Sequence, residues 1–314
     1  MPLDERDALF QHFLGLAIDR LDPSLRIRGH KPEHIIFRVH DQSSASPLRY
    51  NGFTATSRRF KPIARMSNAI WRERYESLHQ DENYRNDEHV LKSIAAHVMG
   101  GWPGYIRDQT GPSDWISTTK SLDWAVWEIT RRLVKMGRNS VELSLIYRRG
   151  YRPGDQGVQH VELDATQAVE ALGEQVWLND DQKCARDFAK ASSEVICLGR
   201  IFGTDIAENT VWTRASPPPG FGPHDACMEA LFLPGVSGIQ GSCWIDKLVF
   251  SPNMSFARAM IHIERRREEI HIDRRREEIE MQRRRQEIEM QRRREEIRRA
   301  RHIYHEEESD SSDE

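Results

Sequence analysis

The stretch WISTTKSLDWAVWEI spans residues 115–129, and its pattern is the main evidence for the fold. It opens with apolar residues, continues through the hydroxyl side chains of Ser117, Thr118 and Thr119, and has helical spacing from about Ser121. We therefore expect a strand that leads into a helix. The hydroxyls have two interpretations: Thr119 or Ser121 caps the helix, or the group holds a catalytic side chain in place.

The segments around this stretch alternate between strand and helix patterns. Apolar and polar residues alternate in HIIFRVH from His34, and β-branched or apolar residues fill VELSLIYRRG from Val141 and SEVICLGRI from Ser193. Helical periods are expected in two longer segments, Asp4 to Leu21 and Pro62 to Met99, the second ending at paired glycines. This order of elements indicates an α+β domain.

Composition changes along the chain suggest five segments. PPPGFGP, at 217–223, cannot continue a helix or a sheet and marks a boundary. We expect a main domain, a Pro/Gly linker, a small appended segment that packs on the main domain, an Arg/Glu repeat helix and an acidic disordered tail, at residues 1–216, 217–225, 226–255, 256–304 and 305–314.

The overall composition indicates in which part of the cell the protein is expected. The formal net charge is -3, but it averages over very uneven segments. The four cysteines show no Cys-x-x-Cys pairing and no zinc-like spacing with histidine, so free thiols in a reducing compartment are expected. The start of the chain lacks signal-peptide features, and no apolar run approaches the roughly 18 residues of a membrane span. We expect a soluble protein of the cytoplasm or nucleus, without membrane partners.

The segment before the acidic tail consists of nine-residue repeats. IHIERRREE, IHIDRRREE, IEMQRRRQE and IEMQRRREE follow one another over 261–296. Nine residues make about 2.5 helical turns, so successive isoleucines fall on opposite faces, which argues against a heptad coiled coil. Arg–Glu pairs three and four residues apart each contribute roughly 0.2–0.5 kcal/mol. A charged single helix is expected as a spacer or docking element. Its interleaved glutamates argue against nucleic acid as the partner.

The sequence lacks the motifs GxxxxGK[ST], HExxH and GxSxG, which are typical of several large enzyme classes. What remains is a strand arginine, Arg38, the hydroxyl run from Ser117, and a strand acid, Glu194. In order and spacing these resemble the Arg / Ser-Thr-Ser / Glu pattern of ADP-ribosyltransferases, most closely the enzymatic A subunits of cholera and heat-labile enterotoxins. The similarity extends from Ile35 to Trp212 through FRVHDQSS, GFTA, HVLKSIAAHV, WISTTKSLDWA and SEVICLGRIFGTDI. The chain also resembles uncharacterised fungal proteins with this kind of domain.

The resemblance implies a fold, a substrate and roles for the residues. It implies a split β-sandwich with flanking helices that consumes NAD as a mono-ADP-ribosyltransferase or NAD glycohydrolase, without a metal. Glu194 would hydrogen-bond the ribose 2-hydroxyl, Ser117 would orient Glu194, and Arg38 would bind phosphate or ribose oxygens. Thr118 and Thr119 would brace the strands around the nicotinamide pocket. The partners implied are NAD and an unknown protein acceptor.

Two departures from the family pattern leave a second interpretation open. Thr119 stands for the usual third serine, a mild change because both offer a hydroxyl. Ser192 stands where arginine-modifying members carry a further glutamate. Three possibilities remain: hydrolysis of NAD, transfer of ADP-ribose to an acceptor other than arginine, or loss of catalysis. Loss of catalysis would make the domain an interaction module. Arg38 and Glu194 could also be solvent-facing charges, and His89 and His97, two helical turns apart, have no third ligand for a metal.

Overall fold

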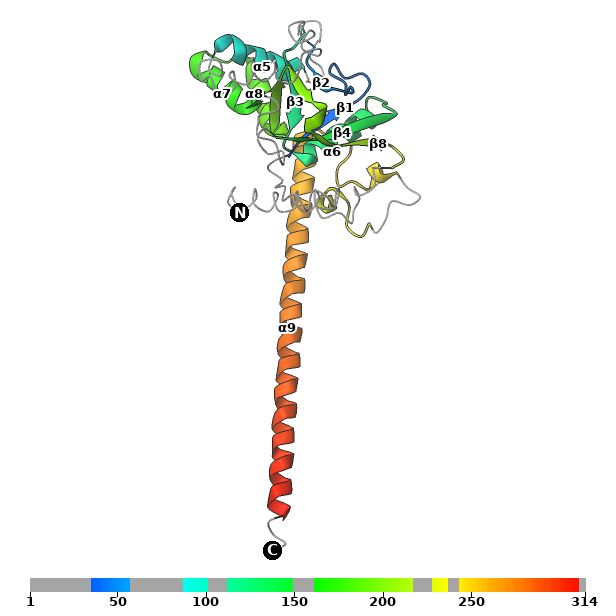
Figure 1. Ribbon diagram of the computed structural model, residues 1–314, viewed down its shortest axis with the longest axis vertical. Coiled ribbons are helices and arrows are strands. Elements are labelled where there is room, and N and C mark those ends of the chain that lie inside the picture. The colour runs from blue at the N-terminus through cyan, green and yellow to red at the C-terminus, as the bar shows by residue number, and fades with distance from the viewer. Residues whose placement is uncertain are drawn as a thin grey trace. The chain divides into compact units, whose positions relative to one another are not determined.

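The computed structural model of the 314-residue chain describes residues 35–56, 87–100, 112–148, 161–216, 228–236 and 243–310 (Figure 1). The chain divides into two compact units, 1–263 and 264–314, which are described separately. The helix expected over Asp4–Leu21, the first part of Pro62–Met99 and the Pro/Gly linker at 217–225 lie outside the described residues.

The first unit is built on a six-stranded antiparallel sheet with the strand order β5-β6-β3-β1-β4-β8. These strands are β1 (Ile35–His40), β3 (Trp115–Thr119), β4 (Ser140–Tyr147), β5 (Val161–Asp164), β6 (Glu194–Leu198) and β8 (Ile206–Thr213). A second sheet pairs β2 (Gly52–Thr54) with β7 (Arg200–Phe202). Together with the helices below, this arrangement confirms the α+β class.

The two-stranded sheet depends on a glycine. Gly52 has a φ of +98°, which L side chains rarely adopt, and a Cβ there would lie 2.0 Å from the carbonyl oxygen of Ile201. The backbones of β2 and β7 can therefore approach each other only because residue 52 has no side chain.

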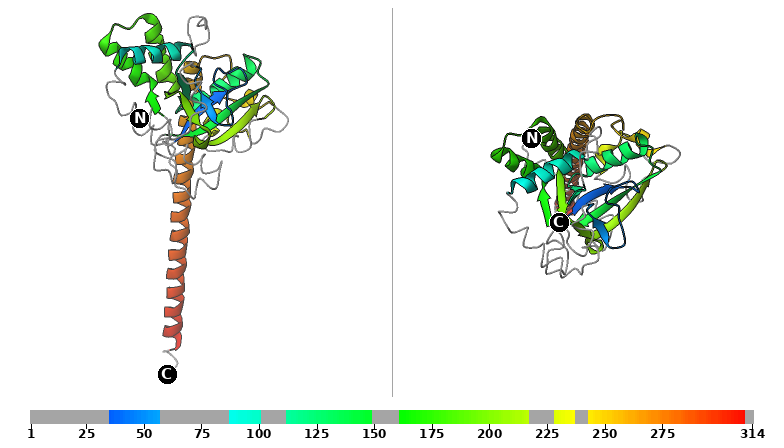
Figure 2. Two further views of the ribbon diagram at one scale, coloured as in Figure 1. Left: turned by 45° about the horizontal axis from the view of Figure 1, so that its top comes forward. Right: turned by 90° about the horizontal axis from the view of Figure 1, so that it is seen from above.

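Four α-helices accompany these strands in the part of the first unit that the structure describes: α5 (Glu88–Gly100), α6 (Leu122–Val134), α7 (Ala165–Gln175) and α8 (Asp180–Ser192). Helices α5, α7 and α8 gather at the side of the unit away from β4 and β8 (Figure 2). Side chains cap the starts of three of them: Ser121 caps α6, Asp164 caps α7, and Asn179 forms a capping box with Gln182 at α8.

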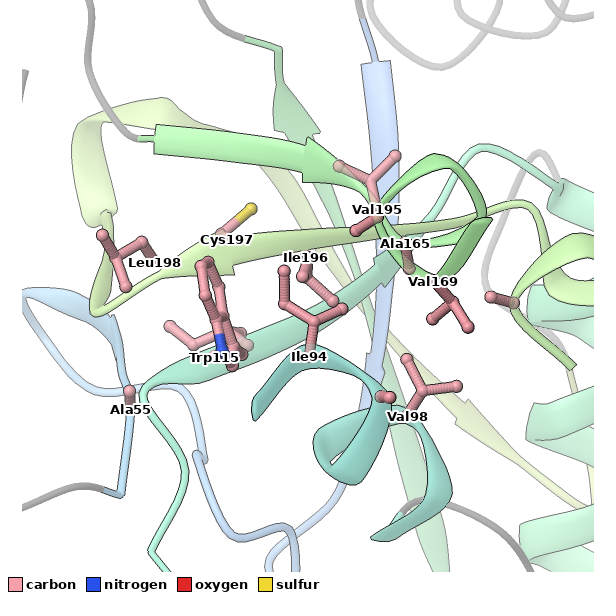
Figure 3. Packing of buried hydrophobic residues seen from close by; sticks show 14 of the residues in the cluster. Ala55, Ile94, Val98, Trp115, Ala165, Val169, Val195, Ile196, Cys197 and Leu198 are labelled. Atoms are coloured by element: carbon pink, nitrogen blue, oxygen red, sulfur yellow. The ribbon is translucent and has the colours of Figure 1, made fainter. Parts of the chain in front are cut away.

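The core between these helices and the sheet is apolar and closely packed (Figure 3). Ile94 of α5 points toward Trp115 and toward Ile196 of β6, and Val98 of the same helix lies beside Val169 of α7, all at most 3% exposed (Figure 3). Burial of such side chains is worth about 1.5–3 kcal/mol each. This core fixes β3 and β6 side by side, and the polar site described below lies on these two strands.

Residues 228–236 and 243–255 belong to the first unit. Trp244 packs against Trp212 of β8 with 5.5 Å between ring centroids, and its indole N–H donates to the carbonyl oxygen of Thr213 at 2.8 Å. An isolated bridge joins Phe232 to Leu248.

The second unit consists of the repeat helix. Helix α9 runs from Phe256 to Asp310, and its first residues, up to Ile263, count with the first unit. It continues beyond Tyr304, where it was expected to end, because His305–Asp310 include three glutamates, which are good helix formers. Ion pairs such as Arg284–Glu280 at 2.6 Å and Arg293–Glu289 at 2.8 Å have the four-residue spacing predicted for a solvated helix. Among the described residues, no helix has the length and apolarity of a membrane span.

Candidate active site

Arg38 lies in the middle of β1 and is 8% exposed, so it is not the solvent-facing charge of the simpler interpretation. Its guanidinium donates to the carbonyl oxygens of Ser117 at 2.5 Å and Ser46 at 2.9 Å, and lies 4.8 Å from the ring centroid of Phe53. Burial, and then the positive charge of Arg132, lower the pKa of Arg38 to about 10, so the side chain stays cationic at neutral pH. It ties β1 to β3 at the position of the first hydroxyl.

The loop after β1 is fixed by buried ion pairs. Asp41 accepts hydrogen bonds from the backbone N–H and the hydroxyl of Ser43, and pairs with Arg132 of α6 at 3.1 Å. Arg132 and Arg131 also bind Glu128, and these contacts hold the pKa of Glu128 below its usual range although burial opposes them. The loop that carries the Ser46 carbonyl is thereby anchored to α6, which helps to hold Arg38 in one orientation.

Ser117 and Glu194 lie on neighbouring strands and on the same face. Ser117 of β3 is opposite Ile196 of β6, and Glu194 is two residues from Ile196. The Ser117 hydroxyl lies close enough to the carboxyl group of Glu194 to lower the pKa of that group. The fold therefore places these two residues side by side, and the role assigned to each stays a prediction.

Glu194 is a buried acid with an altered pKa. Its side chain is 4% exposed, so it too differs from the solvent-facing interpretation. Burial raises its pKa to about 7, and the hydrogen bond from Ser117 and the charge of Arg38 offset part of that rise. Its second carboxyl oxygen, Oε2, has no hydrogen-bond partner, and neither has Nε of Arg38. The site thus contains one buried acceptor and one buried donor that the protein leaves unsatisfied.

The other two hydroxyls of the run hold the strands together. Thr118 donates to the carbonyl oxygen of Val195 at 2.6 Å, and Thr119 donates to the carbonyl oxygen of Ser192. Ser121 caps α6 through the backbone N–H of Trp124. The run therefore both caps the helix and holds the site: Ser121 is the cap, Ser117 reaches Glu194, and the threonines fasten β3 to β6 and to the end of α8.

Ser192 lies at the buried end of a helix and not in a loop that could bind an acceptor. It is the last residue of α8, 1% exposed, and its hydroxyl donates to the carbonyl oxygens of Phe188 at 2.8 Å and Ala189 at 3.2 Å. One residue, Ser193, joins the helix to Glu194, with the left-handed φ of 49°. The position that would carry a further acid is thus part of a helix end, directed into the protein.

His97 joins the site without having been assigned a role from the sequence. Its Nε2 lies 2.9 Å from the Ser117 hydroxyl and its Nδ1 lies 2.7 Å from the Ser113 hydroxyl. Burial, and then the charge of Arg38, lower the pKa of His97 to about 4, so the ring is neutral at pH 7. The sequence feature that could have predicted this contact is the position of His97 three residues after Ile94. Residues three apart lie on the same face of a helix, and Ile94 faces the core. His89, by contrast, is exposed.

Metal binding has no support in the described ranges: no group of three or more His, Cys, Asp or Glu side chains there has the geometry to hold a metal ion. The residues that converge are Arg38, Ser117, Glu194 and His97, a set with one cation, one acid of raised pKa and two neutral groups. Such a set suits a polar organic ligand better than a metal.

The comparison with curated proteins yields no match. Among solved structures, EcPltA is similar to this chain with 14% sequence identity and a TM-score of 0.33, over 57% of this chain and 76% of that one. A TM-score of that size does not establish a common fold. The family described as "Domain of unknown function (DUF7587)" matches residues 31–214, a range that contains all the residues of the candidate site. The chain therefore belongs to this family of domains of unknown function.

Proposed function

We propose that the domain binds NAD and cleaves its bond between nicotinamide and ribose, within an ADP-ribosyltransferase-like split β-sandwich. The observation that carries the proposal is the convergence of Arg38, Ser117 and Glu194, with Oε2 of Glu194 and Nε of Arg38 buried and without partners. Native proteins seldom leave buried polar atoms unsatisfied without a ligand or water to meet them. A ribose hydroxyl and a phosphate oxygen are groups that suit the acceptor and the donor.

Glu194 would act on the ribose. As the glycosidic bond breaks, nicotinamide leaves with the bonding electron pair and positive charge develops on the ribose ring. A carboxylate that accepts a hydrogen bond from the 2-hydroxyl stabilises this charge more in the transition state than in the ground state. Ser117 holds the carboxylate, and neutral His97 is placed to hold the Ser117 hydroxyl.

Arg38 would bind the negatively charged part of the dinucleotide. Two of its guanidinium nitrogens are held by the carbonyl oxygens of Ser117 and Ser46, which leaves Nε for the ligand. The side chain is thus oriented before substrate arrives, so that little conformational entropy is lost on binding. A guanidinium is suited to phosphate, because its planar donors match the geometry of the oxygens.

The acceptor of the ADP-ribose would be water or a group other than arginine. Ser192 cannot act as a carboxylate base, and it is bonded into the end of α8. The catalytic activity that this chain supports best is therefore NAD hydrolysis. Cys184, Cys197 and Cys243 are free, which suits the reducing interior of the cytoplasm or nucleus.

Nicotinamide release from NAD tests this proposal. The wild-type protein should release nicotinamide, and Glu194→Gln should lower the rate by roughly 10²- to 10³-fold, the usual loss when one transition-state contact is removed. Glu174→Gln, the same chemical change at an exposed position of α7, is the matched control and should leave the rate unchanged. An equal rate for wild type and Glu194→Gln would remove Glu194 from the reaction.

The alternative is an interaction module that retains the fold without catalysis, and the buried position of Ser192 favours it. Calorimetry with NAD separates the two. Binding without nicotinamide release, together with weaker binding by Arg38→Lys, would support a non-catalytic NAD-binding module. The absence of both binding and turnover would overturn the assignment of NAD as the ligand.

A further inference from the structure

Helix α9 carries a straight line of apolar side chains beyond the first unit. Ile272, Ile279, Met290 and Ile297 are 49–58% exposed. The intervals between them are seven, eleven and seven residues. Seven plus eleven residues make five turns of an α-helix at about 3.6 residues per turn, so all four side chains lie within about 20° of one line along the axis. We call this line the isoleucine face.

The charges beside the isoleucine face have one sign. Within about 60° of the line, the charged residues between positions 272 and 297 are five arginines, namely Arg275, Arg276, Arg283, Arg293 and Arg294. Gln286 lies in the same sector, and Gln282 and Glu287 lie just outside it, each about 70° from the line. The glutamates of the same stretch that are nearest to the line lie about 70–110° away and form a ridge on either side of it: Glu278, Glu280, Glu287, Glu289 and Glu296.

The opposite face of the helix carries charges of both signs. Its exposed apolar residues are Met281 and Ile288, and acids, Glu277 and Glu295, lie between its arginines. Acids occur within that sector, whereas the isoleucine face has none. The two faces therefore differ in charge although they arise from the same repeat.

We propose that the isoleucine face binds an acidic amphipathic helix of a partner protein. Such a helix would place aliphatic side chains against the four apolar positions and carboxylates against the five arginines. Because an eighteen-residue repeat over five turns matches the period of a straight helix, the pair would run side by side with little supercoiling. The acidic ridges on both flanks would repel a partner that is acidic all round, and so would favour one with its carboxylates confined to a single face.

Charge and spacing disfavour the other occupants of this face. A second copy of the chain would bring its own five arginines against these five, and like charges at an interface are repulsive. Nucleic acid would meet the arginines but also the glutamate ridges, and its phosphates would leave the four apolar side chains without contacts. A membrane surface requires a broader apolar stripe than four residues spread over about 26 positions.

The test uses the full-length protein and a synthetic helical peptide of about 26 residues. The peptide carries leucines at intervals of seven, eleven and seven residues, with glutamates flanking them, and its binding is followed by fluorescence anisotropy. The pair Arg283→Glu with Arg294→Glu should weaken binding at least tenfold. The matched pair on the opposite face, Arg285→Glu with Arg292→Glu, has the same net charge and should change binding less than about twofold.

A second set of double variants tests the contribution of the apolar side chains to binding. Ile279→Gln with Ile297→Gln should weaken binding at least tenfold, whereas Met281→Gln with Ile288→Gln should leave it within about twofold of wild type. Far-ultraviolet circular dichroism checks that each variant keeps its helix. The proposal is overturned if the acidic peptide does not bind, or if both faces respond equally. It is also overturned if single-stranded RNA competes at the same concentration as the peptide, or if sedimentation shows that the protein self-associates through the isoleucine face.

Discussion

Replacing Glu194 by glutamine should stabilise the domain, and by an amount that depends on pH. The pKa of Glu194 in the folded protein is about 7, against 4.5 for the free side chain. Between these two values the folded state binds more protons at this position than the unfolded state, so this group makes stability fall as pH rises across that window. Each pKa unit corresponds to about 1.4 kcal/mol, so the ionised carboxylate costs the folded domain about 3 kcal/mol at pH 8 and less than about 1 kcal/mol at pH 5.

The difference in unfolding free energy between Glu194→Gln and wild type should therefore grow by about 2–3 kcal/mol from pH 5 to pH 8. Urea unfolding followed by tryptophan fluorescence measures it, since all eight tryptophans precede the repeat helix. His40 and His97, whose pKa values burial lowers to about 4, are present in both proteins and cancel in the comparison. Glu174→Gln serves as the exposed control. A difference that stays constant with pH would show that Glu194 is not a buried acid of raised pKa, and would refute the reasoning.

Three further predictions concern the rate of the proposed reaction and the stability of the fold. The kcat/KM of nicotinamide release, measured at NAD concentrations well below KM, should rise with pH through about 7 and level off above it, because the carboxylate form of Glu194 is the active one; a kcat/KM that falls over this range would contradict that role. Ser121→Ala should cost about 1 kcal/mol in urea unfolding through loss of the α6 cap and leave the rate per folded molecule unchanged, whereas Ser117→Ala should lower the rate. Gly52→Ala should destabilise the domain by at least about 2 kcal/mol, since its Cβ would meet the Ile201 carbonyl oxygen; a neutral result in thermal unfolding would show that β2 and β7 can separate.

The parts of the fold that could be predicted from the sequence are those set by local patterns. Alternation marked β1 as a strand and a run of apolar residues marked β6, and Ser121 was one of two residues expected to cap α6. Helix α8 was not predicted, because its composition is polar, yet the capping box of Asn179 and Gln182 is a local signal that marks its start. Alternation and capping act over a few residues, so they can be read from a single sequence.

The candidate site could be predicted only in part. The resemblance identified Arg38, Ser117 and Glu194, and the structure brings them together. The contact between His97 and Ser117, and the anchoring of Asp41 by Arg132, join residues far apart in the chain. Such contacts follow from how the elements pack, which no local pattern determines. The burial of Glu194, and with it the raised pKa, likewise depends on the whole core.

The junction at Ser193 limits how this chain can change. A single residue separates the end of α8 from Glu194, and it is bonded on both sides: its N–H donates to the Lys190 carbonyl oxygen, and its own carbonyl oxygen accepts from the N–H of Lys120. Side chains alternate along a strand, so one residue inserted into β6 directly after Glu194 would turn the acid to the other face of the sheet relative to the rest of the strand. A residue added at the junction itself would disturb the two backbone hydrogen bonds of Ser193 to Lys190 and Lys120. A new acceptor-binding loop at this junction would therefore have to replace both bonds.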